Sequence, residues 1–500
     1  MRLHDHVDRW AAQQPHAEFA VHGGRRLTWT QARAASGGAA RVLRGAGLEP
    51  GDRCAVLARN AIEYLLLYVA ASRAGVVLVP LNPRSTDREW SHVVADAEAR
   101  LLVVGPGFED VSGAPAVSLD ELVDGGGAAP ESPGDGTTEL LRLYTGGTTG
   151  APKGASLAQG AVTAAMAQIA AGPHGGPPGE RALVVAPLSH AGVVWAALAP
   201  LVWGASLVFA DTADPDEVVR ALDERRIGYA ALVPAVLGPM VDVPGAAGRP
   251  YANLRLLHTG SAPINAPTLR RAVEVFGCDV VQGYGLTETA AAATTMTPAD
   301  TQRALRDRPD LLGSVGRPLS GTSVRVVDGE GARVAVGVDG EVVVRGPQLM
   351  AGYAGRPDAT RAALRGGWLH TGDVGHVDAE GYLHLTDRLT DVVVSGGENV
   401  YSAVVEQVLR AHPAVAEAAV VGIPDPRWGE TVHAAVVLRP GAAVSADELV
   451  AFARARLGGV QRPRSVEFRS ALPRTSMGKV HKRALREPFW VGHERRVAGV

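Results

Sequence analysis

Short, almost uniformly apolar runs alternate with helical stretches over the first two-thirds of the chain, and this alternation constrains the fold most. The runs at Arg53–Ala58, Val76–Leu81 and Tyr229–Pro234 are typical of buried strands, and Asp214–Arg226 is typical of a helix. We expect Asn60 to cap a further helix after the first of these runs. Apolar strands that alternate with helices favour parallel sheets covered on both faces. The sequence therefore predicts an α/β fold.

The pattern changes after about residue 320, where shorter runs such as Ala332–Val336 and Gly340–Gly346 are separated by glycine turns. These runs predict a small antiparallel, β-barrel-like part. Towards the C-terminus, strands and helices alternate again in a compact α+β module. We therefore expect a large N-terminal domain of parallel sheets, helices and the barrel-like part over residues 1–387. A hinge at 388–391 and a mobile α+β C-terminal domain over 392–500 would follow.

Composition excludes several classes of protein. With 46% hydrophobic and 20% charged residues and a formal charge of −3, the 500-residue chain is not intrinsically disordered. Cys54 and Cys278 form neither a disulfide framework nor a zinc-binding spacing, which is typical of a reducing cytosol. The apolar stretch Tyr64–Leu81 is interrupted by Arg73 and Gly75, so it predicts a helix and a strand and not a membrane span. We expect a soluble, cytoplasmic protein.

Basic residues dominate Arg454–Val500, whereas the rest of the chain is acidic overall. A basic end on an acidic body suits a polyphosphate ligand shared between domains, and a solvated basic face is the alternative. No nucleic-acid-binding motif or aromatic stacking pattern accompanies the charge, which disfavours a nucleic-acid partner.

The glycine- and threonine-rich segment Leu141–Ala155 carries the strongest local signal. An expected strand runs into a loop whose glycines let backbone N–H groups approach phosphate oxygens, while its threonines add hydroxyl donors and its lysine adds positive charge. The spacing does not fit a Walker A motif, and an ordinary turn is the alternative. The residues expected to contact a phosphate here are Thr145, Gly146, Gly147, Thr148, Thr149, Gly150 and Lys153.

Five segments together resemble the adenylate-forming superfamily of acyl-CoA synthetases, luciferases and nonribosomal adenylation domains. They are the segment above, GYGLTET at Gly283–Thr289, TGD at Thr371–Asp373, DRLTDVVVSGGENVY at Asp387–Tyr401 and PRTSMGKVHKRAL at Pro473–Leu485. One such match would be weak, but five in the family's order across the whole chain are specific. Fatty-acid and arylcarboxylate CoA ligases are the most similar members. The resemblance implies activation of a carboxylic acid by ATP and Mg²⁺ to acyl-AMP, followed by thioester formation with CoA.

The resemblance also assigns roles to individual residues. Lys479 is expected to stabilise the negative charge that develops between the acyl carboxylate and the α-phosphate. Thr287 would hydrogen-bond a phosphate, and Glu288 would hold Mg²⁺ through a carboxylate oxygen. Asp373 and Arg388 would contact the ribose and a phosphate. Further ATP or AMP contacts are expected at Gly260, Ser261, Ala262, Gly283, Tyr284 and Gly285.

CoA is the expected acceptor, because the resemblance places Gly396 and Gly397 beside the pantetheine tunnel and Trp428 against CoA. Domain-interface packing is the alternative for Trp428. Arg462 matches a position near the CoA nucleotide, with a solvated face as its alternative. Thr390 is the expected hinge residue, in a position where the family usually carries Asp or Lys.

The residues that line the acyl pocket are the hardest to predict from the sequence. His190 is expected to gate it and is counted with the catalytic residues, although a satisfied core histidine is the alternative. The other residues expected to line the pocket are Gly192, Val193, Gly260, Gly285 and Ala290. Because this set offers no charged anchor, an aryl or medium-chain acid fits better than a dicarboxylate.

Two alternatives stay open. The enzyme could pass its activated intermediate to a carrier protein, an amine or another nucleophile, or could activate a non-carboxylate oxyanion such as nitrite. A non-catalytic binding protein that retains the fold is the other alternative, and Lys479 and Glu288 argue against it. The sequence names neither the acid nor the pathway, and it leaves a homodimer open.

Overall fold

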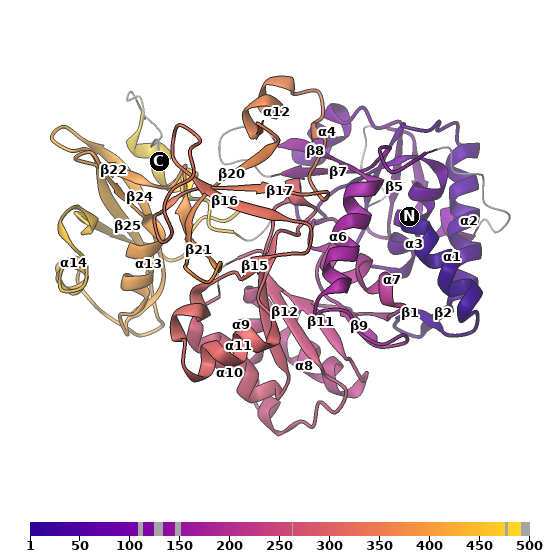
Figure 1. The fold of residues 1–500 in the computed structure, drawn as a ribbon, viewed down its shortest axis with the longest axis horizontal. Coiled ribbons are helices and arrows are strands. Elements are labelled where there is room, and N and C mark those ends of the chain that lie inside the picture. The colour runs from indigo at the N-terminus through magenta and orange to yellow at the C-terminus, as the bar shows by residue number, and fades with distance from the viewer. Residues whose placement is uncertain (109–113, 125–133, 146–151, 263, 476–478, 492–500) are drawn as a thin grey trace. The chain divides into compact units, whose positions relative to one another are not determined.

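The computed structural model divides the chain into two compact units (Figure 1). The larger unit comprises residues 1–145, 151–324 and 344–369, and the smaller unit comprises residues 146–150, 325–343 and 370–500. The structure describes every residue except 109–113, 125–133, 146–151, 263, 476–478 and 492–500. The predicted boundary and hinge at 388–391 stay predictions.

The first sheet of the larger unit has the strand order β15-β14-β13-β12-β11-β9-β10-β1-β2. Strands β13 to β1 along this order run parallel, and antiparallel strands lie at both edges. Helix α9 (Pro234–Met240) contacts β12, and helix α10 (Ala266–Phe276) contacts β13. The bounds of the strands are β1 Glu18–His22, β2 Arg25–Thr28, β9 Arg181–Val184, β10 Ser206–Phe209, β11 Tyr229–Leu232, β12 Leu256–Gly260, β13 Asp279–Tyr284, β14 Thr294–Thr295 and β15 Arg317–Pro318.

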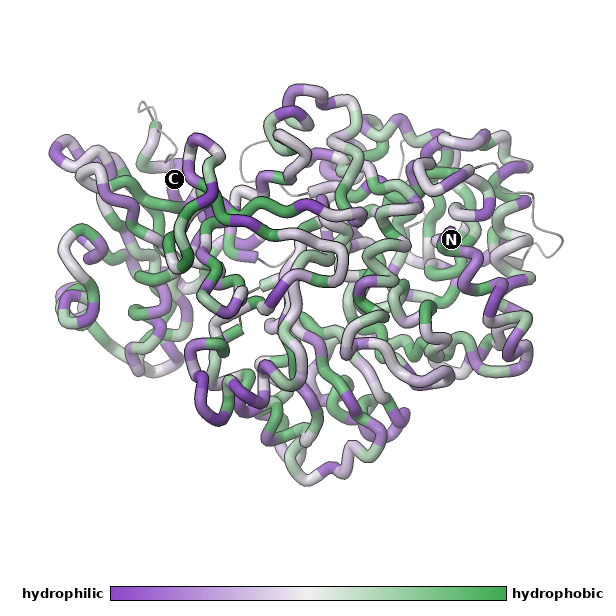
Figure 2. Tube along the Cα trace, viewed as in Figure 1, coloured by the Kyte–Doolittle hydropathy of each residue, from purple (hydrophilic) through white to green (hydrophobic). Residues whose placement is uncertain are grey.

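The second sheet has the order β18-β8-β7-β4-β3-β5-β6 and is parallel from β7 to β6. Its strands are β3 Arg53–Leu57, β4 Val77–Pro80, β5 Leu101–Val104, β6 Ala116–Ser118, β7 Glu139–Thr145, β8 Lys153–Ala158 and β18 Gly352–Tyr353. Hydrophobic residues follow the strands, whereas hydrophilic residues are frequent on outer helices and turns (Figure 2). The predicted α/β architecture of parallel sheets and helices is confirmed.

The α-helices of the larger unit are α1 Leu3–Gln13, α2 Trp29–Gly45, α3 Ile62–Ala74, α4 Asp87–Asp96, α5 Leu119–Asp124, α6 Gln159–Ala171, α7 Pro200–Trp203, α8 Pro215–Glu224, α9 Pro234–Met240, α10 Ala266–Phe276, α11 Pro298–Arg306 and α12 Pro357–Ala363. A π-helix, η1, spans Val194–Leu198.

Helix α3 and strand β4 account for the apolar stretch Tyr64–Leu81. Every residue of α3 is buried, which explains its apolar character without a membrane. In the described part of the chain, no helix combines the length and apolar character that a membrane span requires. The predicted cap of α3 at Asn60 is wrong, because Ala61 occupies the cap position. The Asn60 side chain instead accepts a hydrogen bond from the Leu188 backbone N–H and donates one to the Ala186 carbonyl.

A smaller sheet follows, with the order β16-β17-β20-β19 and with β21 paired to β20. Its strands are β16 Ser323–Val327, β17 Gly340–Arg345, β19 Leu364–Arg365, β20 Trp368–Val377 and β21 Leu383–Arg388. The strand expected at Ala332–Val336 is not formed, because only Arg333 makes a bridge, to Val327. Two backbone hydrogen bonds flank this bridge, from the Asp328 N–H to the Ala332 carbonyl and from the Val334 N–H to the Val326 carbonyl, and a turn begins only at Val336.

The C-terminal part is the predicted α+β module. Its sheet has the order β23-β22-β25-β24, with β26 parallel to β25. Val405 of α13 and Leu449 of α14 pack on one face, and Leu485 of α15 packs on the other. The elements are β22 Val393–Ser395, β23 Glu398–Val400, β24 Val415–Asp425, β25 Gly429–Leu438, β26 Ser465–Phe468, α13 Ser402–Arg410, α14 Ala446–Arg454 and α15 Lys482–Arg486.

Candidate functional site

The hairpin β7–β8 positions the two described ends of the glycine-rich loop. Thr145 ends β7 and Lys153 begins β8, and the two residues are register partners. The Thr145 hydroxyl donates to the Lys153 carbonyl at 3.4 Å. The antiparallel pairing thus brings both ends of the loop together. The expected phosphate contacts at Gly146, Gly147, Thr148, Thr149 and Gly150 lie outside the described residues.

The carboxyl ends of β12 and β13 bring two further predicted segments together. Gly260 and Gly283 are register partners on these parallel strands. Beyond β12, Ser261 is exposed with a left-handed φ of 67°, and Ala262 is exposed beside it. Tyr284 ends β13, Gly285 follows it, and both are half-buried. Carboxyl ends of parallel strands are the usual place for ligands in such sheets.

Glu288 lies on the short 3₁₀ helix η3 (Thr287–Thr289), directly after that strand end. The hydroxyl of Tyr353 donates to Glu288 Oε1 at 2.7 Å. Burial, together with the Glu288 carboxylate, raises the pKa of Tyr353, so the hydroxyl keeps the proton that it donates. Lys153 Nζ lies 5.3 Å from the centroid of the Tyr353 ring. Tyr353 therefore lies between the lysine of the hairpin and the carboxylate of η3.

This arrangement fits Mg²⁺ chemically. Mg²⁺ prefers hard oxygen ligands and usually binds one or two carboxylates together with substrate phosphates. The bond from Tyr353 to Glu288 Oε1 orients the carboxylate, and Thr287 adds a hydroxyl next to it. Tyr353 was missed from the sequence because it comes from β18, which pairs with β8 and lies far along the chain from Glu288.

A strained turn follows η3. Ala290 and Ala291 are non-glycine residues with left-handed φ values of 47° and 62°. The indole N–H of Trp195 donates to the Ala291 carbonyl at 2.7 Å. A non-glycine residue with a left-handed φ costs free energy, so the surrounding structure must hold it in that conformation. Trp195 supplies such support and connects η1 to the turn.

The segment expected to line the acyl pocket leads into η1. His190 is half-buried, and its Nδ1 accepts from the Gly192 backbone N–H at 3.2 Å. Val193 is fully buried directly before η1. π-Helical turns occur frequently at functional sites.

Trp195 also belongs to a stack of aromatic rings that the sequence did not reveal. Its ring lies parallel to His258, with centroids 3.9 Å apart, and His174 meets it edge-on at 5.0 Å. His258 Nε2 and His174 Nδ1 are buried and have no hydrogen-bond partner among the described residues. Burial lowers the pKa of His174 to about 3 and that of His258 well below its usual value, so both rings are neutral. A Cβ on Gly283 would lie 2.8 Å from His258 Nε2, so the stack borders the strand ends.

In the smaller unit, Asp373 and Arg388 form an ion pair, and Lys479 lies within electrostatic range of both. Asp373 on β20 and Arg388 on β21 are register partners, and Arg388 Nε lies 3.0 Å from Asp373 Oδ1. Desolvation and the Arg388 guanidinium lower the pKa of Lys479, and the Asp373 carboxylate acts in the opposite direction. These residues come from three separate motifs of the sequence.

The predicted hinge residue lies in a turn directly after β21. Arg388 O accepts from the Asp391 and Val392 backbone N–H groups, at 2.8 and 3.1 Å. The carbonyl of Thr390 accepts from Arg486 Nη1 of α15 at 3.1 Å. The turn is thus fastened to the helix that follows the Lys479 segment.

The residues expected to bind CoA gather around the hairpin β22–β23. Gly396 and Gly397 form its turn, with left-handed φ values of 63° and 85°. The Gly396 N–H donates to the Trp428 carbonyl at 2.8 Å, and a Cβ on Gly396 would lie 2.7 Å from the Trp428 ring. Glycine is therefore required where the hairpin meets Trp428.

Arginines surround this tryptophan. The guanidinium carbons of Arg427 and Arg464 lie 4.9 and 5.9 Å from the centroid of the Trp428 ring. Sequence reasoning missed both of these residues. Arg462 follows the 3₁₀ helix η5 (Gly459–Gln461) and donates to the Leu457 carbonyl at 3.2 Å. Helix η5 contacts β23 and β25, so Arg462 lies in the same part of the module.

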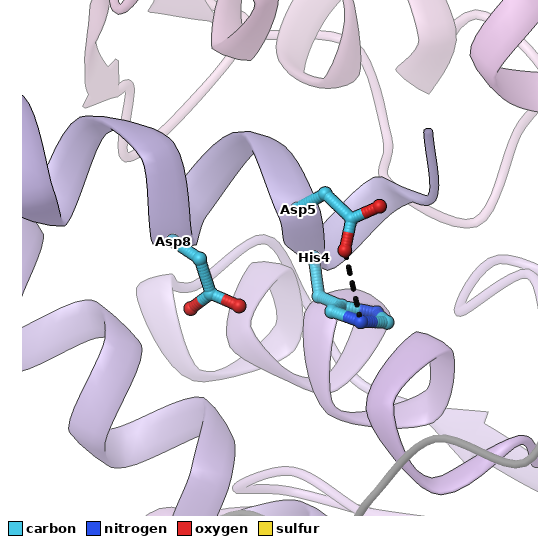
Figure 3. Close-up of side chains that lie close together, drawn as sticks. All are labelled: His4, Asp5 and Asp8. Carbon is cyan, nitrogen blue, oxygen red and sulfur yellow. Dashed lines mark ion pairs between the residues drawn. The ribbon is translucent and has the colours of Figure 1, made fainter.

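A group of possible metal ligands, His4, Asp5 and Asp8, lies on α1 (Figure 3). His4 Nε2 is 3.3 Å from Asp5 Oδ1, and Arg73 contacts both Asp8 oxygens, at 3.0 and 2.5 Å. Arg33 lies 3.5 Å from Asp8 as well. Because arginines already balance these charges, the group is an ion-pair network of the fold, and we assign no metal to it.

Two models of known protein families match this chain. Residues 7–354 match the model of the AMP-binding enzymes, and residues 404–479 match that of the AMP-binding enzyme C-terminal domain. A feruloyl-CoA synthase from an Amycolatopsis species is 39% identical over 488 residues, covering 96% of this chain and 98% of that protein. The fatty acid–[acyl-carrier-protein] ligase ScoC of Streptomyces coeruleorubidus is 37% identical over 503 residues, covering 97% of this chain and 96% of that protein. The crystal structure of ATP-bound MatB from Rhodopseudomonas palustris has a TM-score of 0.90 at 30% identity, covering 99% of this chain and 100% of that one.

Proposed function

The chain belongs to the family of AMP-binding enzymes, and from this membership we propose that it is an AMP-forming ligase that joins an aryl acid to CoA. The observation that carries the proposal is the grouping of Asp373, Arg388 and Lys479 in the smaller unit. A carboxylate that can accept from ribose hydroxyls stands beside two cations that can approach an α-phosphate. Such a set suits adenylyl transfer, which needs positioning and charge stabilisation more than acid–base catalysis.

In the first step, a carboxylate oxygen of the acid attacks the α-phosphorus of ATP. The new O–P bond forms as the bond between the α-phosphorus and its bridging oxygen breaks, and pyrophosphate leaves. Lys153 and the glycine-rich loop would bind the phosphates, Thr287 would hydrogen-bond a phosphate oxygen, and Glu288 would hold Mg²⁺. When bound, Mg²⁺ neutralises charge on the phosphate oxygens. Lys479 stabilises the charge shared between the carboxylate and the α-phosphate.

In the second step, the thiolate of CoA attacks the acyl carbonyl, the C–S bond forms, and AMP leaves with the oxygen. We assign residues 1–387 to an ATP- and acid-binding domain and residues 392–500 to a domain that rotates about 388–391. Gly396 and Gly397 border pantetheine, while Trp428 and Arg462 bind the nucleotide end. Arg464, whose guanidinium lies near the Trp428 ring, adds a further cation for the CoA phosphates.

An aromatic acid with no charged group besides its reacting carboxylate is the substrate that the larger unit suits best. His174 and His258 are buried and neutral, and they stack with Trp195 beside the strand ends. None of these three rings carries a charge that could pair with a second carboxylate, which argues against a dicarboxylic acid. The similarity to a feruloyl-CoA synthase supports the same substrate class. Both cysteines are free and buried, which supports a cytoplasmic location.

An acyl carrier protein is the second candidate acceptor, because ScoC, a fatty acid–[acyl-carrier-protein] ligase, is nearly as similar as the feruloyl-CoA synthase. The arginines around Trp428 would then meet an acidic protein surface in place of CoA phosphates.

A panel of carboxylic acids tests both proposals. Pyrophosphate release is measured with ATP, Mg²⁺ and each acid, first alone and then with CoA or with a phosphopantetheinylated carrier protein. We expect an aromatic acid to give the fastest release and CoA to accelerate turnover. Acceleration by the carrier protein alone would favour the second candidate, and the absence of acid-dependent release across the panel would refute both.

A further inference from the structure

Lysine is almost absent from this chain. Of the 49 Lys and Arg residues, all except Lys153, Lys479 and Lys482 are arginine. Two of these lysines already have proposed roles at the phosphates and in adenylyl transfer. Lysine offers a compact ammonium with three rotatable donors, whereas arginine offers a rigid planar fork. Lys482 is the remaining lysine, and an arginine in its place would present a planar fork in place of the ammonium.

The ammonium of Lys482 lies between two side chains of α13. Its Nζ is 2.7 Å from Glu406 Oε1 and donates to Ser402 Oγ at 2.7 Å. Ser402 Oγ in turn donates to Asp387 Oδ2 at 2.7 Å. A continuous polar path thus runs from Lys482 at the start of α15 to Asp387 on β21.

The charges along this path are buried and depend on one another. The side chains of Lys482 and Glu406 are only 14% and 10% exposed. Burial acts to lower the pKa of Lys482, but the carboxylates of Glu406, Asp387 and Asp391 raise it, so the amine stays charged. Burial raises the pKa of Asp387, and Lys482 opposes that rise. Removing one partner of a buried pair leaves the other charge uncompensated.

Both ends of the path adjoin the residues proposed for adenylyl transfer. Asp387 directly precedes Arg388, which contacts Asp373 at 3.0 Å. Lys482 follows Lys479 by three positions. The path therefore joins the segment that carries the catalytic lysine to the strand that carries its neighbouring arginine.

From this geometry we infer that Lys482 is a positioning residue, which acts through Ser402 and Asp387 to hold Lys479 beside Arg388 and Asp373. The inference rests on the proposed function. Asp387 precedes the proposed hinge, whereas Ser402, Glu406 and Lys482 follow it. Rotation for the thioester step must then break the contact from Ser402 to Asp387, while the Lys482–Glu406 pair moves as one piece. The link favours adenylation and is not needed for thioester formation.

The test compares the two half-reactions in Lys482→Met and Ser402→Ala variants of the full chain. Adenylation is followed by acid-dependent exchange of pyrophosphate into ATP, and thioester formation is followed from supplied acyl-AMP and CoA. Because each variant removes a hydrogen bond with a charged partner, we expect adenylation to fall about tenfold or more. We expect the rate of thioester formation to stay within about twofold of the wild-type rate, because the contact from Ser402 to Asp387 is already broken in that step. Lys482→Arg keeps the charge, and its adenylation rate should lie between those of Lys482→Met and the wild type.

Arg483→Met is the matched control. Arg483 is the next residue of α15, its side chain is 39% exposed, and it pairs with Glu487 at 2.7 Å. Both half-reactions should be unchanged in this variant. Thermal unfolding shows whether Lys482→Met folds. If it does not fold, the half-reactions of Ser402→Ala test the inference, because this variant retains the buried Lys482–Glu406 pair.

Equal losses in both half-reactions, or unchanged adenylation in Ser402→Ala, would overturn the inference and leave the proposed function standing. A wild-type protein that shows no acid-dependent exchange would overturn the proposed function, and the inference with it.

Discussion

Replacing Tyr353 with phenylalanine isolates one contact of the proposed magnesium site. The variant loses the hydroxyl that donates to Glu288 Oε1 at 2.7 Å, but it keeps the ring near Lys153 Nζ. A hydrogen bond to a charged group contributes about 1.5–3 kcal/mol. Because Tyr353 and Glu288 are half-buried, the lower value applies, and about 1.4 kcal/mol corresponds to a tenfold change. We therefore expect kcat/KM for ATP in adenylation to fall about tenfold.

The assay is acid-dependent pyrophosphate exchange, measured over a range of ATP and Mg²⁺ concentrations. The loss should be partly recovered at high Mg²⁺, since a less well oriented Glu288 weakens metal binding. Thioester formation from supplied acyl-AMP should be unchanged. Tyr251→Phe is the control, because it removes a buried hydroxyl that donates to the Ala246 carbonyl at 3.0 Å. Equal effects of the two substitutions, or a loss that does not depend on Mg²⁺, would refute the role given to Tyr353.

Three further predictions concern other parts of the molecule. Lys479→Ala should lower adenylation by about 10²–10³-fold and leave thioester formation from supplied acyl-AMP largely intact; similar losses in both reactions would remove its assigned role. Trp428→Ala should raise KM for CoA several-fold without changing pyrophosphate exchange, and an unchanged KM would withdraw it from the CoA site. Buried, neutral His174 has a pKa of about 3, below the usual 6.5, so the unfolded chain binds the extra proton on acidification. The contribution of this histidine to stability is complete above pH 6.5 and declines as the pH falls towards about 3; its loss at pH 5 is roughly 2 kcal/mol. His174→Gln should therefore show a weaker decrease of the thermal unfolding temperature between pH 7 and 5, and an unchanged decrease would contradict the burial argument.

Local sequence patterns predicted the apolar strands β3, β4, β11 and β17, but they did not reveal short strands such as β14, β15 and β18. Buried parallel strands such as β3 and β4 can be predicted from the sequence because they consist of continuous apolar runs. The error at Asn60 arose because its side chain is used by the distant backbone at Ala186 and Leu188, and not by its own helix. The missing strand at Ala332–Val336 shows that alternating apolar residues between glycines can also form a single isolated bridge in place of a regular strand.

Residues within motifs were easier to anticipate than residues that tertiary contacts bring to them. Asp373, Arg388 and Lys479 stand in separate motifs, and the structure groups them. Tyr353 reaches Glu288 only because β18 pairs with β8. His174 meets Trp195 through the packing of segments that share no local pattern. Such partners carry no signal in a single sequence.

The identity of the products tests the central claim most directly. ATP, Mg²⁺, CoA and the best acid of the panel are incubated with the protein, and the nucleotides and thioesters are quantified by mass spectrometry. The account predicts AMP and the aryl-CoA thioester in equal amounts, with no AMP above background when the acid is left out. Formation of ADP in place of AMP, or AMP that accumulates without any thioester, would contradict it.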